Sequence, residues 1–252
     1  MESLKTLVYA HRGASKLAPE NTMPAFQLAY EMGAEGIETD VQLSKDGIPV
    51  LIHDETVRRT TNAIGFVQDY TYEQLQNLDA GSWFSEKFEN TPIISLEEFL
   101  AWAEGKNIDL NIELKNNVID YSDLEKKVYQ LLIKYKLARR TTISSFNPAS
   151  IERFKHIDRK IATALLTSQR IKGLVDYAAG LGAHALHIKH RLLNSAIVEQ
   201  CFEKDMALRV YTINRVSLMK KCYQLKADAI FTDVPDIAID QRQLFTGGNH
   251  SY

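Results

Sequence analysis

The segment 36–43, with the sequence GIETDVQL, constrains the fold more than any other part of the chain. Side chains of a β-strand alternate between its two faces, so Glu38, Asp40 and Gln42 share one face and the residues at 37, 39, 41 and 43 share the other. The second, less polar face can pack against helices, which leaves two carboxylates and an amide pointing into a barrel. Buried carboxylates are rare unless they are paired or hold a metal, so this face predicts a functional site.

Around this segment, short runs of β-branched residues alternate with longer stretches of helical periodicity. The predicted strands lie at 7–11, 36–43, 108–114, 142–145, 161–165, 185–188, 208–212 and 229–231. The predicted helices lie at 24–32, 95–105, 122–136, 148–156, 171–180, 194–204, 216–225 and near 236–241. Eight strands, each followed by a helix, predict an α/β fold of the (β/α)8 TIM-barrel type. An open doubly wound sheet is the alternative, but no Gly-x-Gly-x-x-Gly follows the first strand.

The chain is predicted to form one barrel domain over residues 1–252, with a small insertion at about 44–94 after the second strand. Residues 48–53 are typical of a hairpin partner, because they follow the turn residues Lys45-Asp46-Gly47. Residues 55–94 then form an excursion before the second helix. No linker rich in Pro, Ser or Gly divides the chain, and no internal repeat is visible.

Composition excludes several classes of protein. The 252 residues include 30 Lys and Arg against 32 Asp and Glu, so the basic excess typical of nucleic-acid binding is absent. No apolar run approaches the ~18 residues of a membrane span. Cys201 and Cys222 are expected to be buried thiols, which suits a reducing compartment. The first ten residues lack the apolar core of a signal peptide, so we expect a cytoplasmic location unless a leader has been removed. The sequence has no coiled-coil stripe that would indicate an oligomeric state.

The predicted strand 109–115, DLNIELK, repeats the polar pattern of 36–43. Its polar face carries Asn111, Glu113 and Lys115, so we expect a third carboxylate beside Glu38 and Asp40. Three converging carboxylates repel one another, and a divalent cation removes that repulsion. Oxygen ligands favour Ca²⁺ or Mg²⁺ over Zn²⁺. The alternative is a set of solvated acids paired by Arg12 or Lys115.

Two histidines lie at the ends of predicted strands, His11 and His53, and together they suit general acid–base catalysis. Arg12 offers a planar donor fork for an anionic oxygen. Gly13 is expected to let the backbone approach a ligand closely. The remaining histidines are predicted to lie in helices, loops or the tail and receive no role: His156, His184, His187, His190 and His250.

A set of short motifs then follows in a recognisable order. His11-Arg-Gly-Ala, Ala18-Pro-Glu-Asn-Thr22, Glu38-Thr-Asp40, His53-Asp54 and Glu113-Leu-Lys115 resemble the motifs of the glycerophosphodiester phosphodiesterases. Ser144-Ser-Phe-Asn147, Tyr211-Thr-Ile-Asn214 and Phe231-Thr-Asp-Val-Pro235 extend the resemblance over residues 11–235. The resemblance implies a barrel hydrolase that cleaves glycerophosphodiesters to an alcohol and sn-glycerol 3-phosphate. The excursion at 55–94 is short and would cover only part of the barrel mouth, so we expect a small soluble diester as the substrate.

The same resemblance implies roles for individual residues. It implies a divalent cation, Ca²⁺ or Mg²⁺, on Glu38, Asp40 and Glu113, with His11 and His53 as the acid–base pair. The residues that it assigns to substrate binding are Arg12, Lys115, Tyr211, Glu20 and Asn21. Tyr stands at 211 where family members often carry Trp, which leaves the glycerol or leaving-group preference open. For Glu20, a helix N-terminal acid that interacts with the helix dipole is an equal alternative.

The mechanism that the resemblance implies is attack by the glycerol 2-hydroxyl on phosphorus, followed by hydrolysis of the cyclic phosphate. Direct attack by water is the variant. The nearest alternative function is a lysophospholipase D or phospholipase C-like barrel phosphodiesterase, which an exposed apolar rim would favour. The candidates for such a rim are Trp83, Phe84, Ile93, Ile94 and Trp102. A non-catalytic phosphate-binding barrel is disfavoured because the histidines and acids are all retained.

Overall fold

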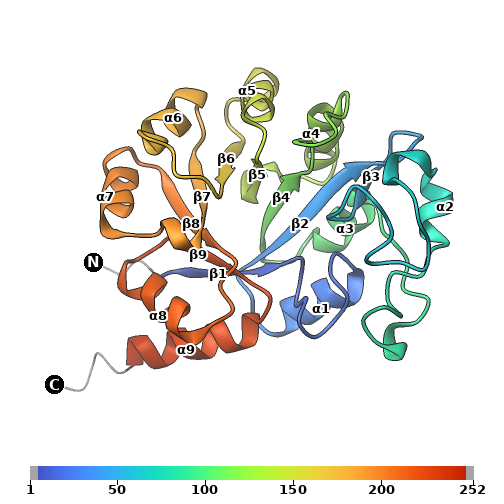
Figure 1. The fold of residues 1–252 in the computed structure, drawn as a ribbon, viewed down its shortest axis with the longest axis horizontal. Helices are drawn as coiled ribbons and strands as arrows, with labels where there is room; N and C mark the ends of the chain where they lie inside the picture. The colour runs from blue at the N-terminus through green and yellow to red at the C-terminus, as the bar shows by residue number, and fades with distance from the viewer. Residues whose placement is uncertain (1–4, 248–252) are drawn as a thin grey trace.

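The computed structural model describes residues 5–247 and shows a closed ring of eight parallel strands surrounded by helices (Figure 1). The parallel strands are β1 Leu7–His11, β2 Gly36–Leu43, β4 Asp109–Leu114, β5 Thr141–Ser145, β6 Ala162–Thr167, β7 Ala185–Lys189, β8 Ala207–Tyr211 and β9 Ala229–Thr232. β1 pairs with both β2 and β9, and these two pairings close the ring. The predicted TIM barrel is confirmed, and predicted strand ends differ from observed ones by at most two residues.

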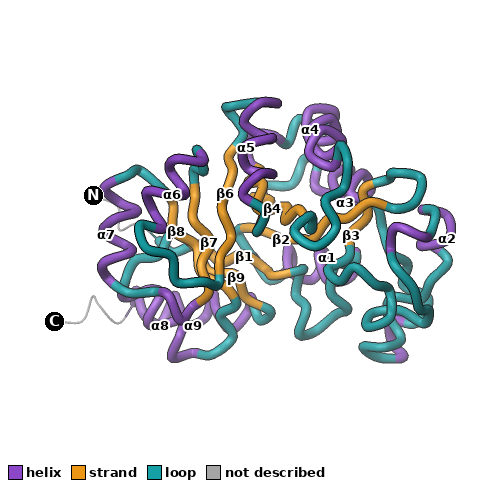
Figure 2. The backbone as a smooth tube through the Cα atoms, turned by 45° about the horizontal axis from the view of Figure 1, so that its top comes forward, coloured by secondary structure: helices purple, strands orange, loops and turns teal. Residues whose placement is uncertain are grey.

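One outer helix follows nearly every barrel strand (Figures 1 and 2). These helices are α1 Met23–Glu31, α3 Leu96–Ala103, α4 Leu124–Lys134, α5 Pro148–Ile157, α6 Leu174–Leu181, α7 Ser195–Glu203, α8 Val216–Gln224 and α9 Pro235–Gly247. Local signals set several of their starts. The Ser95 hydroxyl accepts from the Glu98 N–H and the Glu98 carboxylate accepts from the Ser95 N–H, which is the capping box that begins α3.

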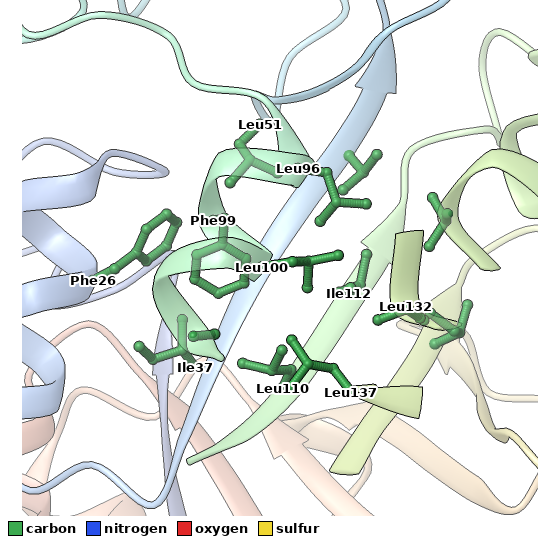
Figure 3. Packing of buried hydrophobic residues seen from close by; sticks show 14 of the residues in the cluster. Phe26, Ile37, Leu51, Leu96, Phe99, Leu100, Leu110, Ile112, Leu132 and Leu137 are labelled. Atoms are coloured by element: carbon green, nitrogen blue, oxygen red, sulfur yellow. The ribbon is translucent and has the colours of Figure 1, made fainter. Parts of the chain in front are cut away.

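The apolar face of β2 packs against the helices, as the alternation of its sequence predicts. Ile37 lies beside Leu110 of β4 and beneath Phe99 of α3 (Figure 3). The Phe26 and Phe99 rings lie 4.5 Å apart between α1 and α3. Burial of each such side chain contributes about 1.5–3 kcal/mol relative to exposure. Packing on this face holds the opposite, polar face of β2 toward the barrel interior.

The insertion after β2 begins with the predicted hairpin. β3, Pro49–Leu51, runs antiparallel to β2, with Leu51 opposite Val41. The rest contains α2, Tyr72–Gln76, two short 3₁₀ turns, Val67–Asp69 and Glu86–Phe88, and irregular loops (Figure 2). It has its own buried apolar cluster, made of Val50, Ile52, Val57, Val67, Leu75, Ala80 and Ile93. The insertion therefore packs as an ordered extension of the barrel.

Helix α9 is longer than predicted, since it extends to Gly247 where the sequence indicated an end near 241. Arg242 explains the difference. Its Nη1 donates to the Thr6 carbonyl and to Glu35, and its Nη2 donates to Glu35, each at 2.7 Å. This polar anchor ties the helix to the start of β1, and Ala238, Ile239 and Phe245 pack against the neighbouring apolar cluster. Within residues 5–247, no helix has the length and apolar character needed to cross a bilayer.

Candidate active site

The carboxyl ends of the barrel strands surround a cavity of about 320 Å³. Six of the ten predicted site residues line it: His11, Arg12, Glu38, His53, Glu113 and Tyr211. The other four do not line it but contact Arg12 or Glu113: Asp40, Lys115, Glu20 and Asn21. The fold therefore brings all ten residues into one continuous set.

Glu38, Asp40 and Glu113 converge as the two strand patterns predict. β2 pairs with β4 so that Asp40 lies opposite Glu113. One carboxylate oxygen from each of the three residues lies within 4.8 Å of the other two. Asp40 Oδ1 is buried and has no hydrogen-bond partner among the described residues. An orphaned carboxylate oxygen in a cluster of oxygen donors fits a hard divalent cation.

Two cations also lie in this cluster, so the pairing that the sequence left as an alternative is present as well. Lys115 Nζ lies 2.9 Å from Glu113 Oε1, and Arg12 Nε lies 3.1 Å from Asp40 Oδ2. Three carboxylates against two cations leave one negative charge. Burial favours a raised pKa for Asp40, but Arg12 and Lys115 outweigh it and hold that pKa well below its ordinary value. Burial, with Asp40 and Glu113 nearby, raises the pKa of Glu38 well above its ordinary value.

Asn21 fixes the position of Asp40. Its Nδ2 donates to Asp40 Oδ2 at 2.9 Å, and its Oδ1 accepts from the Thr39 hydroxyl at 2.8 Å and from the Asp40 N–H at 3.3 Å. Asn21 adopts a left-handed backbone conformation with φ of 56°, which Asn tolerates better than most residues. The side chain is buried, and its amide is engaged by the end of β2.

Glu20 lies between two arginines. It accepts from Arg12 Nη1 at 2.9 Å and from both terminal nitrogens of Arg59 at 2.8 Å. Burial favours a raised pKa for Glu20, but the hydrogen bonds from Arg59 and the charge of Arg12 lower it. Arg59 also donates to Asp54, through Nε at 2.7 Å and Nη2 at 3.0 Å. Arg59 was missed by the sequence analysis, because it lies in an irregular loop without periodicity.

Each of the two predicted histidines has an aspartate on Nδ1. His11 Nδ1 lies 2.7 Å from Asp233 Oδ1, and His53 Nδ1 lies 2.6 Å from Asp54 Oδ1. Burial favours a raised pKa for Asp233, but the hydrogen bond with His11 lowers it. Burial opposes the bonds from Arg59 and His53 at Asp54, which together lower its pKa to about 2. Two ionised aspartates thus orient the rings, and Nε2 of each ring has no protein partner within residues 5–247.

The insertion hairpin, rather than a barrel strand, delivers His53. β3 doubles back along β2, so that the Ile52 N–H donates to the Asp40 carbonyl at 3.1 Å. The side-chain amide of Gln42 donates to the Ile52, His53 and Asp54 carbonyls. Gln42, whose side chain the sequence placed on the polar face of β2, therefore holds the segment that carries His53.

The cavity lining includes a histidine to which the sequence analysis assigned no role. His187 lies on β7 and is fully buried, and neither ring nitrogen has a partner among the described residues. Burial, with Arg209 nearby, lowers its pKa well below the ordinary value. The assignment of His187 to a helix, loop or tail was wrong, because the residue lies within β7 and strand alternation turns its side chain into the cavity. His190 also lines the cavity, and His250 lies outside the described residues.

Tyr211 stands at the end of β8 on the cavity wall. Its ring lies edge-on to Phe146, with 6.1 Å between centroids. Its hydroxyl is buried without a hydrogen-bond partner in the described part of the chain. Burial, and then the charge of Glu113, raises its pKa above the ordinary value, so the hydroxyl stays protonated and can donate to a ligand.

Gly13 is not among the residues that line the cavity, and its lack of a side chain has a packing role. A Cβ on Gly13 would lie 2.6 Å from the Ala25 carbonyl carbon, so the residue allows α1 to approach the β1 end. Its φ is +82°, a conformation that L-residues rarely adopt.

We therefore expect Gly13→Ala to destabilise the protein more than Gly33→Ala. Gly33 has a similar φ of +80°, but a Cβ added there would meet no atom within 4 Å, so it isolates the conformational cost. The clash should add about 1–3 kcal/mol. Denaturant unfolding of both variants measures the difference, and equal losses would contradict the packing role of Gly13.

Comparison with known proteins is consistent with this geometry. Residues 11–237 match the model of the Glycerophosphoryl diester phosphodiesterase family. The chain is 40% identical over 237 residues to a glycerophosphodiester phosphodiesterase of Caldanaerobacter subterraneus subsp. tengcongensis, covering 94% of this chain and 98% of the relative. It is 38% identical to a glycerophosphodiester phosphodiesterase of Bacillus altitudinis, with 94% and 98% covered.

Solved structures show the same architecture. A phosphodiesterase of Oleispira antarctica in complex with the product sn-glycerol-3-phosphate superposes with a TM-score of 0.84 at 30% identity, covering 94% of this chain and 96% of that one. A glycerophosphodiester phosphodiesterase of Agrobacterium tumefaciens superposes with a TM-score of 0.81 at 29% identity, covering 93% and 99%.

Proposed function

This chain belongs to the glycerophosphodiester phosphodiesterase family of phosphoric diester hydrolases, and on that premise we propose how it acts. The proposed reaction is hydrolysis of a small glycerophosphodiester to an alcohol and sn-glycerol 3-phosphate. The observation that carries it is the pair of aspartate-oriented histidines in one cavity with the acid triad Glu38, Asp40 and Glu113. Two proton-transfer groups and a charge-stabilising centre are what cleavage of a phosphodiester requires.

The acid triad is proposed to hold a divalent cation, Ca²⁺ or Mg²⁺. Its donors are all carboxylate oxygens, and the orphaned Asp40 Oδ1 offers a lone pair that no group among the described residues uses. When bound, the cation would polarise the phosphoryl oxygens and stabilise charge that develops on them. Asn21 and Arg12 keep Asp40 oriented in the absence of the ion.

Arg12 and Lys115 are proposed to bind the phosphate. Arg12 uses Nη1 on Glu20 and sets Nε beside Asp40, while Nη2 has no partner within the described residues and the side chain lines the cavity. Lys115 donates to Glu113 and has two further N–H donors. Burial opposes its charge, but Glu113 and Asp40 raise its pKa, so the ammonium stays charged.

The histidines are proposed to move two protons. One Nε2 accepts the proton of the glycerol 2-hydroxyl, whose oxygen bonds to phosphorus while the bond to the leaving alcohol breaks. The other Nε2 donates a proton to that alcohol. Water then opens the cyclic phosphate with the roles exchanged. Acid–base help supplies roughly 10²–10⁴-fold, so phosphate binding and charge stabilisation must supply the rest.

A small diester is the proposed substrate, in preference to a lysophospholipid. Of the five residues considered for an apolar rim, Ile93 and Ile94 are buried, and Trp102 packs on Phe26 and Phe99. Phe84 is half-buried between the Trp83 and Phe88 rings. Of the five, only Trp83 is exposed, and its indole N–H donates to the Ala80 carbonyl. The rim that would favour lipid binding is thus largely used in packing.

A cytoplasmic location is proposed with this activity. Cys201 and Cys222 are both free and buried, which suits a reducing compartment. Their burial raises both pKa values to about 12, so the thiols are inert at neutral pH.

Release of sn-glycerol 3-phosphate tests the function. Glycerophosphocholine and glycerophosphoethanolamine are assayed with and without EDTA, and with Ca²⁺ or Mg²⁺ restored. Metal-dependent release is expected from at least one diester. If neither diester releases sn-glycerol 3-phosphate while circular dichroism shows a folded protein, the proposed function is contradicted. If release continues after prolonged dialysis against EDTA, the proposed divalent cation is contradicted.

The aspartates behind the histidines give a separate prediction. Asp233→Asn and Asp54→Asn should each lower kcat, because an amide favours the wrong histidine tautomer or leaves the ring unoriented. The loss should not exceed the contribution of one acid–base group, about 10²–10⁴-fold. Asp158→Asn serves as the control, because Asp158 caps the C-terminal end of α5 and does not line the cavity. The variants should alter the pH profile of kcat; a change in KM alone would contradict a positioning role.

A further inference from the structure

The mouth of the cavity has a strong charge bias on one side. The three loops that end β6, β7 and β8 have the sequences SQRIKG at 168–173, KHRLLN at 189–194 and TINR at 212–215. They contain five cations, Arg170, Lys172, Lys189, Arg191 and Arg215, which we call the basic rim. They contain no Asp or Glu, although the chain as a whole has more acids than bases.

The charges of the basic rim are available to a ligand. All five side chains belong to exposed residues, and none forms an ion pair within residues 5–247. Arg191 donates through Nη2 to the Ser168 carbonyl, which leaves its charge uncompensated. Arg170 and Arg191 line one cavity, and burial together with the charges of Arg215, Lys189 and Arg191 lowers the pKa of His190, so these four cations lie around the same turn. Clustered, unpaired cations at a cleft attract anions.

The basic rim is continuous with the catalytic cavity. Lys189 and His190 line that cavity together with His11 and His53. The next residue, Arg191, lines a second cavity of about 440 Å³ with Arg170 and Asn194. The 3₁₀ turn His190–Leu192 therefore separates two adjoining cavities. β6, β7 and β8 lie on the side of the barrel away from the insertion (Figure 1).

The opposite wall differs in charge. There Arg59 is paired with both Glu20 and Asp54, so its charge is compensated by two carboxylates. A leaving alcohol that extends out of the catalytic cavity toward the β6–β8 side meets the uncompensated positive charge of the basic rim. A cationic alcohol is repelled there, and an anionic alcohol is attracted.

We propose that the basic rim binds an anionic group on the leaving alcohol, so that the preferred substrates are glycerophosphodiesters whose alcohol carries a phosphate. This inference rests on the proposed function and specifies its substrate class. The rim acts on specificity and takes no part in the cleavage, which the two histidines carry out. The phosphate on the alcohol leaves with it unchanged.

A matched pair of substrates tests the proposal. Glycerophosphoinositol 4-phosphate and glycerophosphoinositol differ only in a phosphate on the leaving alcohol, and glycerophosphocholine supplies a cationic alcohol. We expect kcat/KM to be at least about tenfold higher for the phosphorylated member, with a preference that falls as salt rises. Arg170→Glu/Arg191→Glu should abolish the preference and leave kcat/KM for glycerophosphoinositol within about twofold, since neither side chain lines the catalytic cavity.

The control variant is Arg139→Glu/Arg159→Glu. Both side chains are exposed and lie just before β5 and β6, at the other end of the barrel, so the net charge changes equally. It should keep the wild-type preference. Two results would contradict the proposed role of the basic rim: equal kcat/KM for glycerophosphoinositol 4-phosphate and glycerophosphoinositol, or the same loss of preference in both double variants. If the protein binds vesicles of anionic lipid through the basic rim but shows no preference between the diesters, the proposal is wrong and the rim binds a membrane surface. Failure to cleave any of the three diesters would instead contradict the proposed function.

Discussion

Glu38→Gln and Asp40→Asn are each expected to remove metal-dependent hydrolysis almost completely, lowering kcat/KM by at least about 10³-fold. Each change replaces a carboxylate with an amide of the same shape, so packing of the buried β2 end is retained while one ligand charge is lost. Asp40 is the more informative site, because its Oδ1 has no protein partner among the described residues and its Oδ2 already binds Asn21. The amide removes one negative charge that compensates Arg12, but the barrel should remain folded.

The measurement is kcat/KM against Ca²⁺ or Mg²⁺ concentration, with ion affinity from isothermal titration calorimetry. Glu35→Gln is the matched control, because Glu35 precedes β2 at the opposite end of the barrel and pairs with Arg242. It should lower stability but leave ion affinity unchanged. Full activity of either triad variant in the presence of chelator would end the assignment of the triad to a metal.

The interior of the barrel was predictable because strand periodicity is a local property. Alternation in GIETDVQL and DLNIELK places Glu38, Asp40 and Glu113 on inner faces without knowledge of the rest of the chain. Pairing of β2 with β4 then brings them to the same level. The hairpin turn at Lys45-Asp-Gly47 likewise predicted β3, which carries His53 back to the height of Asp40.

The partners that orient these groups were not predictable, because they depend on contacts between distant segments. His11 and Asp233 are 222 positions apart and meet only because β1 pairs with β9 when the barrel closes. Asn214, from the loop after β8, holds Asp233 by accepting from its N–H at 2.9 Å. Arg59 lies in an irregular loop, where no period marks which residues face the site. The sequence offered one indication of these partners: Asp54 and Asp233 lie within the family motifs but had no assigned role.

Loss of either histidine should have the other large effect, and it should separate proton transfer from ion binding. His11→Ala and His53→Ala are each expected to lower kcat by roughly 10²–10⁴-fold while ion affinity stays at the wild-type level. The double variant should lose little more than the worse single variant, because groups that act in one proton-transfer sequence are not additive. His156→Ala, exposed on α5, is the control.

The leaving group distinguishes the two roles. A glycerophosphodiester of p-nitrophenol needs no protonated leaving group, so the variant that lacks the general acid should recover most of its activity on it. The variant that lacks the general base should not recover, because the 2-hydroxyl still has to lose its proton. Asp233 and Asp54 orient the two histidine rings in the same way. Rescue of one variant therefore identifies which histidine is the general acid and which is the general base. Equal rescue of both, or wild-type turnover in either, would contradict a two-histidine relay.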